Sequence, residues 1–312
     1  MQIISNTTEF QIEEPTAVAI GKFDGVHLGH RKLLAALERK KKEGLRSTVF
    51  TFDPSPAIFF SGGKGAELTV QAEKRVLFER LGVDILVEFP LNAQTAATPP
   101  ENFVREILAG RLHAEFLAAG SDLSFGDKGA GDFALVRRLA DSCGYTSRTI
   151  RKVRVGDEIV SSTKIRSYVE AGQMEEAAAM LAEPYFFLGE IVHGNEIGRT
   201  LEIPTINQRP AEHKLLPPFG VYYSRVEIDG KEYAGMTNIG IKPTVQRSGE
   251  GESSPVTVET YLYDFRGDLY GRTARTCLLT FRRPERRFSG LEELRETMAR
   301  DVAAGREYHR IK

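Results

Sequence analysis

Cysteine is scarce in this chain, and long apolar stretches are missing. The two cysteines, Cys143 and Cys277, lie far apart in the sequence, which fits a reducing environment. No segment approaches the roughly 18 consecutive apolar residues that a membrane helix needs, so a membrane-spanning chain is excluded. The first residues, MQIISNTTEFQIEE, lack the basic start and the apolar stretch of an export signal. We therefore expect a protein that works in the cytoplasm and has no membrane partner.

The chain also lacks a charge excess of either sign. Its 42 basic and 43 acidic residues give a formal net charge of −1, which argues against nucleic acid as the main partner. Two locally basic runs, 148–154 and 272–287, are more typical of solvated faces than of phosphate sites. No GxxxxGK[ST] string occurs anywhere, and this excludes a P-loop mechanism.

The length of 312 residues exceeds what one hydrophobic core usually organises, which favours two domains. In the first half, strand-like and helix-like segments alternate, the pattern of a parallel sheet covered by helices. The spacing predicts strands over 16–20, 46–52, 83–89 and 115–119, and helices over 30–43, 71–81, 100–109 and 132–142. A hairpin around Gly156 and Asp157 and a helical stretch over 164–182 complete this half.

The pattern of predicted elements changes after Glu183 and Pro184, from alternating strands and helices to short strands. We therefore predict domains over 1–183 and 184–312. Beyond this seam, short alternating segments over 220–228, 231–238, 256–263 and 276–281 suggest a small antiparallel barrel. An amphipathic helix over 290–304 carries Leu291, Leu294, Met298 and Val302 on one face. The predicted fold class is therefore α/β plus β: a Rossmann-like parallel sheet with helices, then an antiparallel β-barrel with a terminal helix.

The most specific string of the first half is GKFDGVHLGH, residues 21–30, between the first predicted strand and the first predicted helix. Ligands of open parallel sheets bind at the carboxyl ends of strands, and a helix N-terminus presents unpaired N–H groups to phosphate. The glycines of the string let backbone approach a ligand closely. His27 and His30, three apart at a helix start, can point to the same side and donate to a phosphate in the transition state.

Two further strings of the first half carry polar groups. Residues 161–166 (SSTKIR) stand at the start of the last helix before the seam, where Ser and Thr are ordinary N-caps. The glycine-rich string GSDLSFG, residues 120–126, follows the predicted strand 115–119. Taken alone, either string is weak support for a ligand site.

The string at residues 21–30 resembles the HxGH motif of nucleotidyltransferases, and its longer form GxFDGxHxGH resembles the FMN adenylyltransferase branch. This resemblance implies an ATP site built from Gly21, Phe23, Asp24, Gly25, His27, His30, Ser161, Ser162, Thr163 and Arg166. Within this set it implies catalytic roles for His27, His30 and Arg166, with the SSTxxR element holding the triphosphate. The loop 120–126 resembles the flavin loop of the same family, which implies flavin contacts for Asp122 and Phe125; Leu123 stands where an aromatic residue is usual.

Five strings of the second half, in order along the chain, resemble riboflavin kinases: 189–194, 198–207, 218–222, 238–244 and 258–271. The resemblance implies that Thr205 and Asn207 bring oxygen ligands to Mg²⁺ and ATP phosphate, an environment that Mg²⁺ prefers. It also places Gly194 and Gly198 beside ATP. Glu259 matches the proposed base for the riboflavin 5′-hydroxyl and a flavin contact, and Arg283 matches a flavin or nucleotide contact, with a structural role equally open. Glu202 stands where the family usually has glycine.

These resemblances together imply a bifunctional enzyme that phosphorylates riboflavin to FMN and adenylylates FMN to FAD, with ATP as co-substrate and Mg²⁺ as cofactor. The expected partners are riboflavin, FMN, FAD and ATP, and the expected assembly is a monomer or a weak homo-oligomer. Two other hypotheses remain. In the first, the chain belongs to the same family but only one half is active, an idea supported only by the departures at Leu123 and Glu202. In the second, the chain is a flavin-sensing or RNA-binding regulator that uses the barrel as a binding platform and has lost its catalytic groups.

Overall fold

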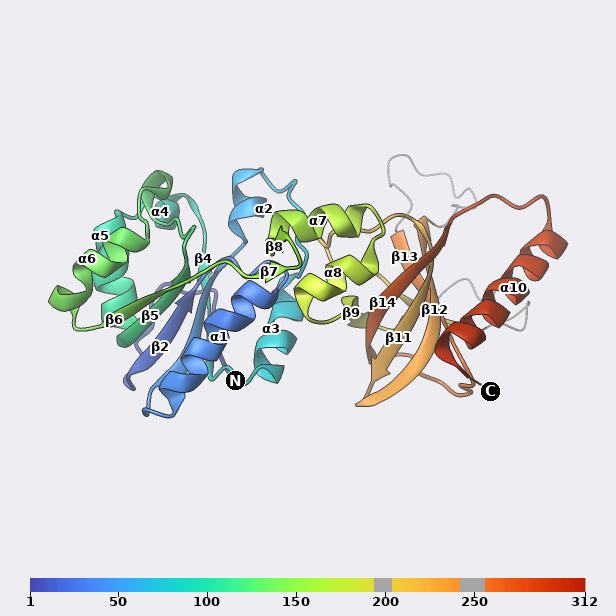
Figure 1. The fold of residues 1–312 in the computed structure, drawn as a ribbon, viewed down its shortest axis with the longest axis horizontal. Helices are drawn as coiled ribbons and strands as arrows, with labels where there is room; N and C mark the ends of the chain where they lie inside the picture. The colour runs from blue at the N-terminus through green and yellow to red at the C-terminus, as the bar shows by residue number, and fades with distance from the viewer. Residues whose placement is uncertain (194–203, 242–255, 312) are drawn as a thin grey trace. The chain divides into compact units, whose positions relative to one another are not determined.

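The first half of the chain forms a parallel six-stranded sheet, as the alternating pattern predicts (Figure 1). We describe a computed structural model, in which residues 1–193, 204–241 and 256–311 are placed. The strands are β1 Gln2–Ser5, β2 Thr16–Ile20, β3 Arg46–Asp53, β4 Ile85–Pro90, β5 Ala114–Gly120 and β6 Thr146–Ile150. Their order across the sheet is β1-β4-β3-β2-β5-β6, and each neighbouring pair is parallel.

Helices connect these strands. They are α1 Leu28–Lys41, α2 Pro56–Phe60, α3 Gln71–Arg80, α4 Ala93–Ala96, α5 Pro100–Asn102 and α6 Phe133–Cys143, with a 3₁₀ turn over Asp127–Gly129. The helix predicted over 100–109 begins at Pro100, but from Phe103 to Arg111 it is a π-helix, η1. Its buried residues Phe103, Val104, Ile107 and Leu108 join one apolar core with the strands.

The strand order reverses at β2, and this positions a ligand site. From β2 the chain passes through β3 to β4 on one side, whereas β5 and β6 lie on the other side of β2. Crevices at such switch points, outside the carboxyl ends of the strands, are where open α/β sheets bind ligands. The loop 21–27 follows β2 and the loop 121–131 follows β5, so both predicted ligand loops come directly after the two strands at this switch point.

The helical stretch predicted over 164–182 is two helices, α7 Ser162–Glu170 and α8 Met174–Leu181, preceded by the predicted hairpin of β7 Arg154–Val155 and β8 Glu158–Ile159. Gly172, with φ of 74°, lies in the break, because this left-handed conformation ends a helix and favours glycine. The chain divides into two units, Met1–Lys164 and Ile165–Lys312. Helix α8 contacts the sheet of the second unit. The domain boundary predicted after residue 183 stays a prediction.

The second unit is built on a six-stranded antiparallel sheet. Its strands are β9 Tyr185–Glu190, β10 Thr205–Gln208, β11 Gly220–Ile228, β12 Lys231–Ile241, β13 Val256–Leu262 and β14 Thr273–Pro284, in the order β10-β13-β12-β11-β14-β9. The two edge strands of this sheet are β10 and β9. A β-bridge joins Val192, just after β9, to Asn207 of β10, so the sheet closes into the predicted barrel. A small apolar cluster containing Ile191, Val226 and Leu262 is buried there.

The terminal helix α10, Leu291–His309, lies alongside β12 (Figure 1) and is longer than the predicted helix over 290–304. Val302, which was expected on its apolar face, packs with Val221, Met236 and Tyr263 of the sheet. Tyr223 stacks on Tyr308 of the helix with ring centroids 4.4 Å apart. The helix therefore covers part of the barrel through apolar and aromatic contacts.

Candidate active sites

The loop between β2 and α1 holds the two predicted histidines against each other. Their rings stack with centroids 3.7 Å apart and planes inclined by only 12°, which confirms that His27 and His30 lie on the same side. His27 is the N-cap of α1, and its Nδ1 accepts a hydrogen bond from the backbone N–H of His30 at 3.4 Å. Because Nδ1 is the acceptor, the proton of a neutral His27 sits on Nε2.

Burial controls the charge of this histidine pair. Desolvation lowers the pKa of His27 to about 4, although the Asp24 and Asp122 carboxylates oppose the shift. Desolvation, with smaller contributions from His27 and Lys74, holds the pKa of His30 well below its usual range. Both imidazoles are therefore neutral at pH 7, and each can donate one N–H to a ligand.

Other residues of this loop make room for the two histidines and pack against them. Phe23 is fully buried; its ring centroid lies 5.0 Å from that of His30 and 5.4 Å from that of Phe78 on α3. A Cβ at Gly29 would stand 3.0 Å from Cε1 of His27, so glycine permits the close stacking. Gly25 has a φ of 91°, a conformation open to glycine. A Cβ at Gly21 would stand 3.2 Å from Cε2 of Phe23, so glycine at this position leaves room for the Phe23 ring.

The string SST, residues 161–163, contacts this loop. Ser162 Oγ donates to the backbone carbonyl of Asp24 at 2.8 Å, across 138 residues of sequence. Asp24 is fixed in turn because its Oδ1 accepts the backbone N–H of Leu68 at 2.7 Å. The side chain of Ser161 accepts the backbone N–H of Lys164 at the start of α7, the ordinary capping role, while Thr163 is exposed. Arg166 lies four residues beyond Ser162 on α7.

The loop after β5 was predicted to contact flavin. Asp122 is exposed there and forms an ion pair with Lys152 at 3.3 Å, which places one residue of the basic run 148–154 at this loop. Phe125 is 4% exposed and packs on Phe103 with ring centroids 5.1 Å apart, while Leu123 packs against the core. Phe125 therefore holds the loop on the sheet, and its predicted flavin contact stays a prediction.

The second predicted site lies across three adjacent strands of the barrel. Glu259 on β13 is directly opposite Asn207 on β10 and directly opposite Asn238 on β12. Directly paired residues share one face of a sheet, as do residues two apart on a strand, so Thr205 joins the same face. Asn207 is 6% exposed, and its Nδ2 donates to the backbone carbonyl of Thr205 at 3.4 Å. Gly194, Gly198 and Glu202 lie outside the described residues.

Sequence models of two families match the chain, FAD synthetase over residues 9–164 and riboflavin kinase over residues 181–309. A bifunctional riboflavin kinase/FMN adenylyltransferase of Escherichia coli K12 is 35% identical over 95% of this chain and 93% of that protein. One from Listeria monocytogenes is 33% identical, with coverage of 95% and 93%. The chain belongs to this bifunctional family. It carries both an FAD synthetase region and a riboflavin kinase region.

A solved structure described as a macrolide-efflux protein from Streptococcus pneumoniae also shares the fold. Its TM-score is 0.83 at 26% identity, with 97% of this chain and 98% of that chain covered. Fold likeness alone does not carry an activity from one protein to another.

In the part of the chain that the structure describes, no helix has both the length and the apolar character that a membrane crossing requires.

One buried ion pair of the FAD synthetase region was not predicted. Lys74 on α3 is 1% exposed, and its Nζ lies 2.7 Å from a carboxylate oxygen of Glu67. The positive charge of Lys74 also lowers the pKa of His30. Lys74 falls within an ordinary helical pattern, so nothing in the sequence marked it as buried. It contributes to keeping the imidazole of His30 neutral.

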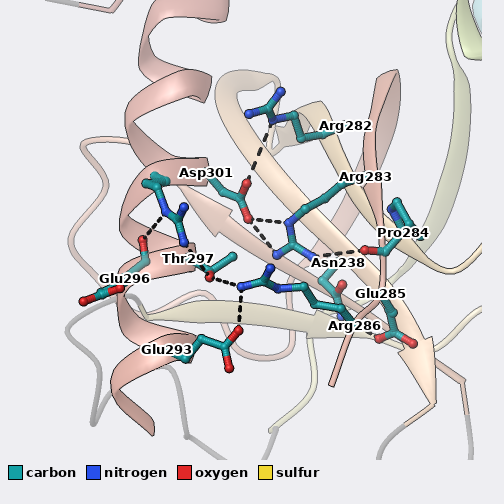
Figure 2. A network of polar contacts seen from close by, with 11 residues as sticks. Asn238, Arg282, Arg283, Pro284, Glu285, Arg286, Glu293, Glu296, Thr297 and Asp301 are labelled. Atoms are coloured by element: carbon teal, nitrogen blue, oxygen red, sulfur yellow. Dashed lines mark hydrogen bonds and ion pairs between the residues drawn. The ribbon is translucent and has the colours of Figure 1, made fainter. Parts of the chain in front are cut away.

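Arg283 of the riboflavin kinase region has a structural partner. Its Nε and Nη2 bind Oδ2 of Asp301 on α10 at 2.8 and 2.7 Å (Figure 2), and Asp301 is 4% exposed. Arg282 approaches the same carboxylate at 3.9 Å. The structural role that the sequence left open is therefore present, and the predicted flavin contact of Arg283 stays a prediction.

We expect Asp301→Ala to lower the free energy of unfolding of this unit by about 2 kcal/mol, because hydrogen bonds to charged groups contribute roughly 1.5–3 kcal/mol. Urea denaturation followed by circular dichroism measures the loss. Glu307→Ala, which removes an exposed carboxylate from the same helix, is the matched control. Equal stability of the two variants would show that the pair with Arg283 does not hold α10 in place.

Proposed function

We propose that this chain converts riboflavin to FMN at the barrel and FMN to FAD at the parallel sheet, consuming one ATP in each step. The observation that carries the proposal is the presence of both polar assemblies in one chain: the stacked histidines tied to the SST string, and Glu259 between two asparagines. The intact groups in each assembly favour this function over a flavin-binding regulator. The second unit of the chain acts first on riboflavin.

In the adenylyl transfer, an oxygen of the FMN phosphate attacks the α-phosphorus of ATP, and the bond to pyrophosphate breaks. The nucleophile is already anionic, so no general base is needed, and positioning and charge neutralisation supply the catalysis. The neutral imidazoles of His27 and His30 donate hydrogen bonds to the phosphate in the transition state. The start of α7, with Ser162 beside Asp24, presents backbone N–H groups to the triphosphate, and Arg166 adds a charge-assisted contact.

Flavin specificity of this step is assigned to the loop after β5. The exposed carboxylate of Asp122 accepts hydrogen bonds from the flavin, and Phe125 and Leu123 fix the loop from the core side. Phe23, Gly21 and Gly25 serve the ATP site by supporting the backbone around the histidines. The two activities divide at the seam proposed from the sequence, with domains over 1–183 and 184–312.

In the kinase step, Glu259 takes the proton of the riboflavin 5′-hydroxyl. The 5′-oxygen of riboflavin attacks the γ-phosphorus of ATP, and ADP leaves. Thr205 and Asn207 offer hydroxyl and amide oxygens beside this carboxylate, a set of hard oxygen donors that fits Mg²⁺. When bound, Mg²⁺ neutralises charge on the ATP phosphates. These two residues are the proposed ligands, and among the described residues no group of three His, Cys, Asp or Glu side chains is placed to hold a metal.

The test is chromatography of the products formed by the purified protein from riboflavin, ATP and Mg²⁺. We expect FMN to form first and FAD to follow, because the product of the barrel is the substrate of the other site. FMN alone would show that only the kinase half is active, and FAD formed only from supplied FMN would show the reverse. Formation of neither product would refute the proposed function.

A further inference from the structure

The face that carries Glu259 includes a second carboxylate, Glu285, which the proposed chemistry does not use. Glu285 follows the end of β14, and its Oε1 accepts a hydrogen bond from Nδ2 of Asn238 at 3.3 Å. Asn238 is directly opposite Glu259 in the register of β12 and β13. The carboxylate of Glu285 is therefore separated from the proposed base by a single amide side chain.

Gly240 gives independent support for this placement. A Cβ at Gly240 would stand 1.9 Å from Oε1 of Glu285, so the carboxylate lies directly over the backbone of β12. Gly240 and Asn238 are two apart on the strand and share one face. The absence of a side chain at residue 240 is what lets Glu285 reach Asn238.

The residues on either side of Glu285 are held by α10 (Figure 2). Arg283 binds the buried carboxylate of Asp301, and Arg286 donates to Thr297 Oγ1 at 2.6 Å and to Glu293 at 3.1 Å. The backbone N–H of Glu285 also donates to the carbonyl of Phe219 at 3.3 Å. The terminal helix thus fixes the segment that carries Glu285.

The charge of Glu285 decides which way the amide of Asn238 points. An ionised carboxylate only accepts hydrogen bonds, so the amide must turn its NH₂ group toward Glu285 and its carbonyl oxygen elsewhere. We propose that Glu285 is a positioning residue of the kinase site, which orients Asn238 so that its carbonyl oxygen accepts hydrogen bonds from the hydroxyls of the riboflavin side chain. This inference rests on the proposed riboflavin kinase function.

The first test compares Glu285→Ala, Asn238→Ala and the double variant in steady-state riboflavin phosphorylation. We expect Glu285→Ala to lower kcat/KM for riboflavin roughly tenfold, the size of one hydrogen bond of about 1.4 kcal/mol, by raising KM for riboflavin and not KM for ATP. Because Glu285 acts through Asn238, adding Glu285→Ala to Asn238→Ala should change nothing further. Additive losses, or an equal rise in both KM values, would overturn the proposal.

A second variant separates position from charge. Gly240→Ala keeps the carboxylate but pushes it off Asn238, and it should reproduce the loss of Glu285→Ala without adding to it. Glu232→Ala, which removes an exposed carboxylate at the far end of β12, is the matched control and should keep wild-type KM values. Adenylylation of supplied FMN by each variant reports the integrity of the other unit. A wild-type protein unable to phosphorylate riboflavin would instead refute the proposed function itself.

Discussion

Glu259→Gln is expected to abolish FMN formation from riboflavin while FAD formation from supplied FMN continues. Glutamine keeps the shape and hydrogen-bonding length of the side chain but cannot take a proton, and general-base catalysis typically contributes about 10²–10⁴ in rate. We therefore expect kcat for riboflavin phosphorylation to fall on the order of 10³. Initial rates with radiolabelled ATP, measured separately with riboflavin and with FMN, give both activities.

The second activity is the internal control for this variant. Glu259 sits on the barrel, and the histidine pair belongs to the other unit, so adenylylation of FMN should stay within twofold of wild type. Glu259→Asp tests geometry, because it retains the base but withdraws it by one methylene, and it should recover part of the rate. Loss of both activities in Glu259→Gln would show that the two halves do not work independently. A rate within threefold of wild type would remove Glu259 as the base.

The sequence predicted an element best where the buried residues of that element form a regular apolar pattern. β2 is buried at all five positions, and its continuous apolar run predicted a central strand. β1 and β6 are edge strands of the same sheet, and their exposed polar residues follow no such run, so neither was predicted. The π-helical form of Phe103–Arg111 was also missed, because an apolar helical pattern does not distinguish it from an α-helix.

For the two sites, short sequence motifs predicted which residues are candidates for the sites, but not which of them contact each other in the fold. The helical spacing of His27 and His30 predicted their common side. The bond from Ser162 to Asp24 spans 138 residues, and that from Asn238 to Glu285 spans 47, and neither contact leaves a local pattern. Chain topology creates these contacts, because each joins residues of elements that are far apart in the sequence.

The histidine pair carries the other large expected effect. His27→Ala should lower adenylyl transfer by on the order of 10²–10³, because it removes a preorganised donor to the transition-state phosphate. His27 also caps α1, so alanine removes a helix cap at the same time. His27→Asn separates these roles, since asparagine is a strong N-cap but has no imidazole. We expect His27→Asn to regain the stability lost in His27→Ala, measured by thermal denaturation, and to stay catalytically impaired.

The pH dependence of the same variants tests the charge of His27. A pKa of about 4 keeps this imidazole neutral from pH 6 to pH 8, so it gains a proton only in strongly acidic solution. The FMN phosphate titrates near pH 6 in every variant, and its effect cancels in a ratio of rates. The ratio of wild-type to His27→Asn rates should therefore be constant across this range. A ratio that rises as pH falls through 6.5 would show that the charged imidazolium is the active form, and that burial does not hold His27 neutral.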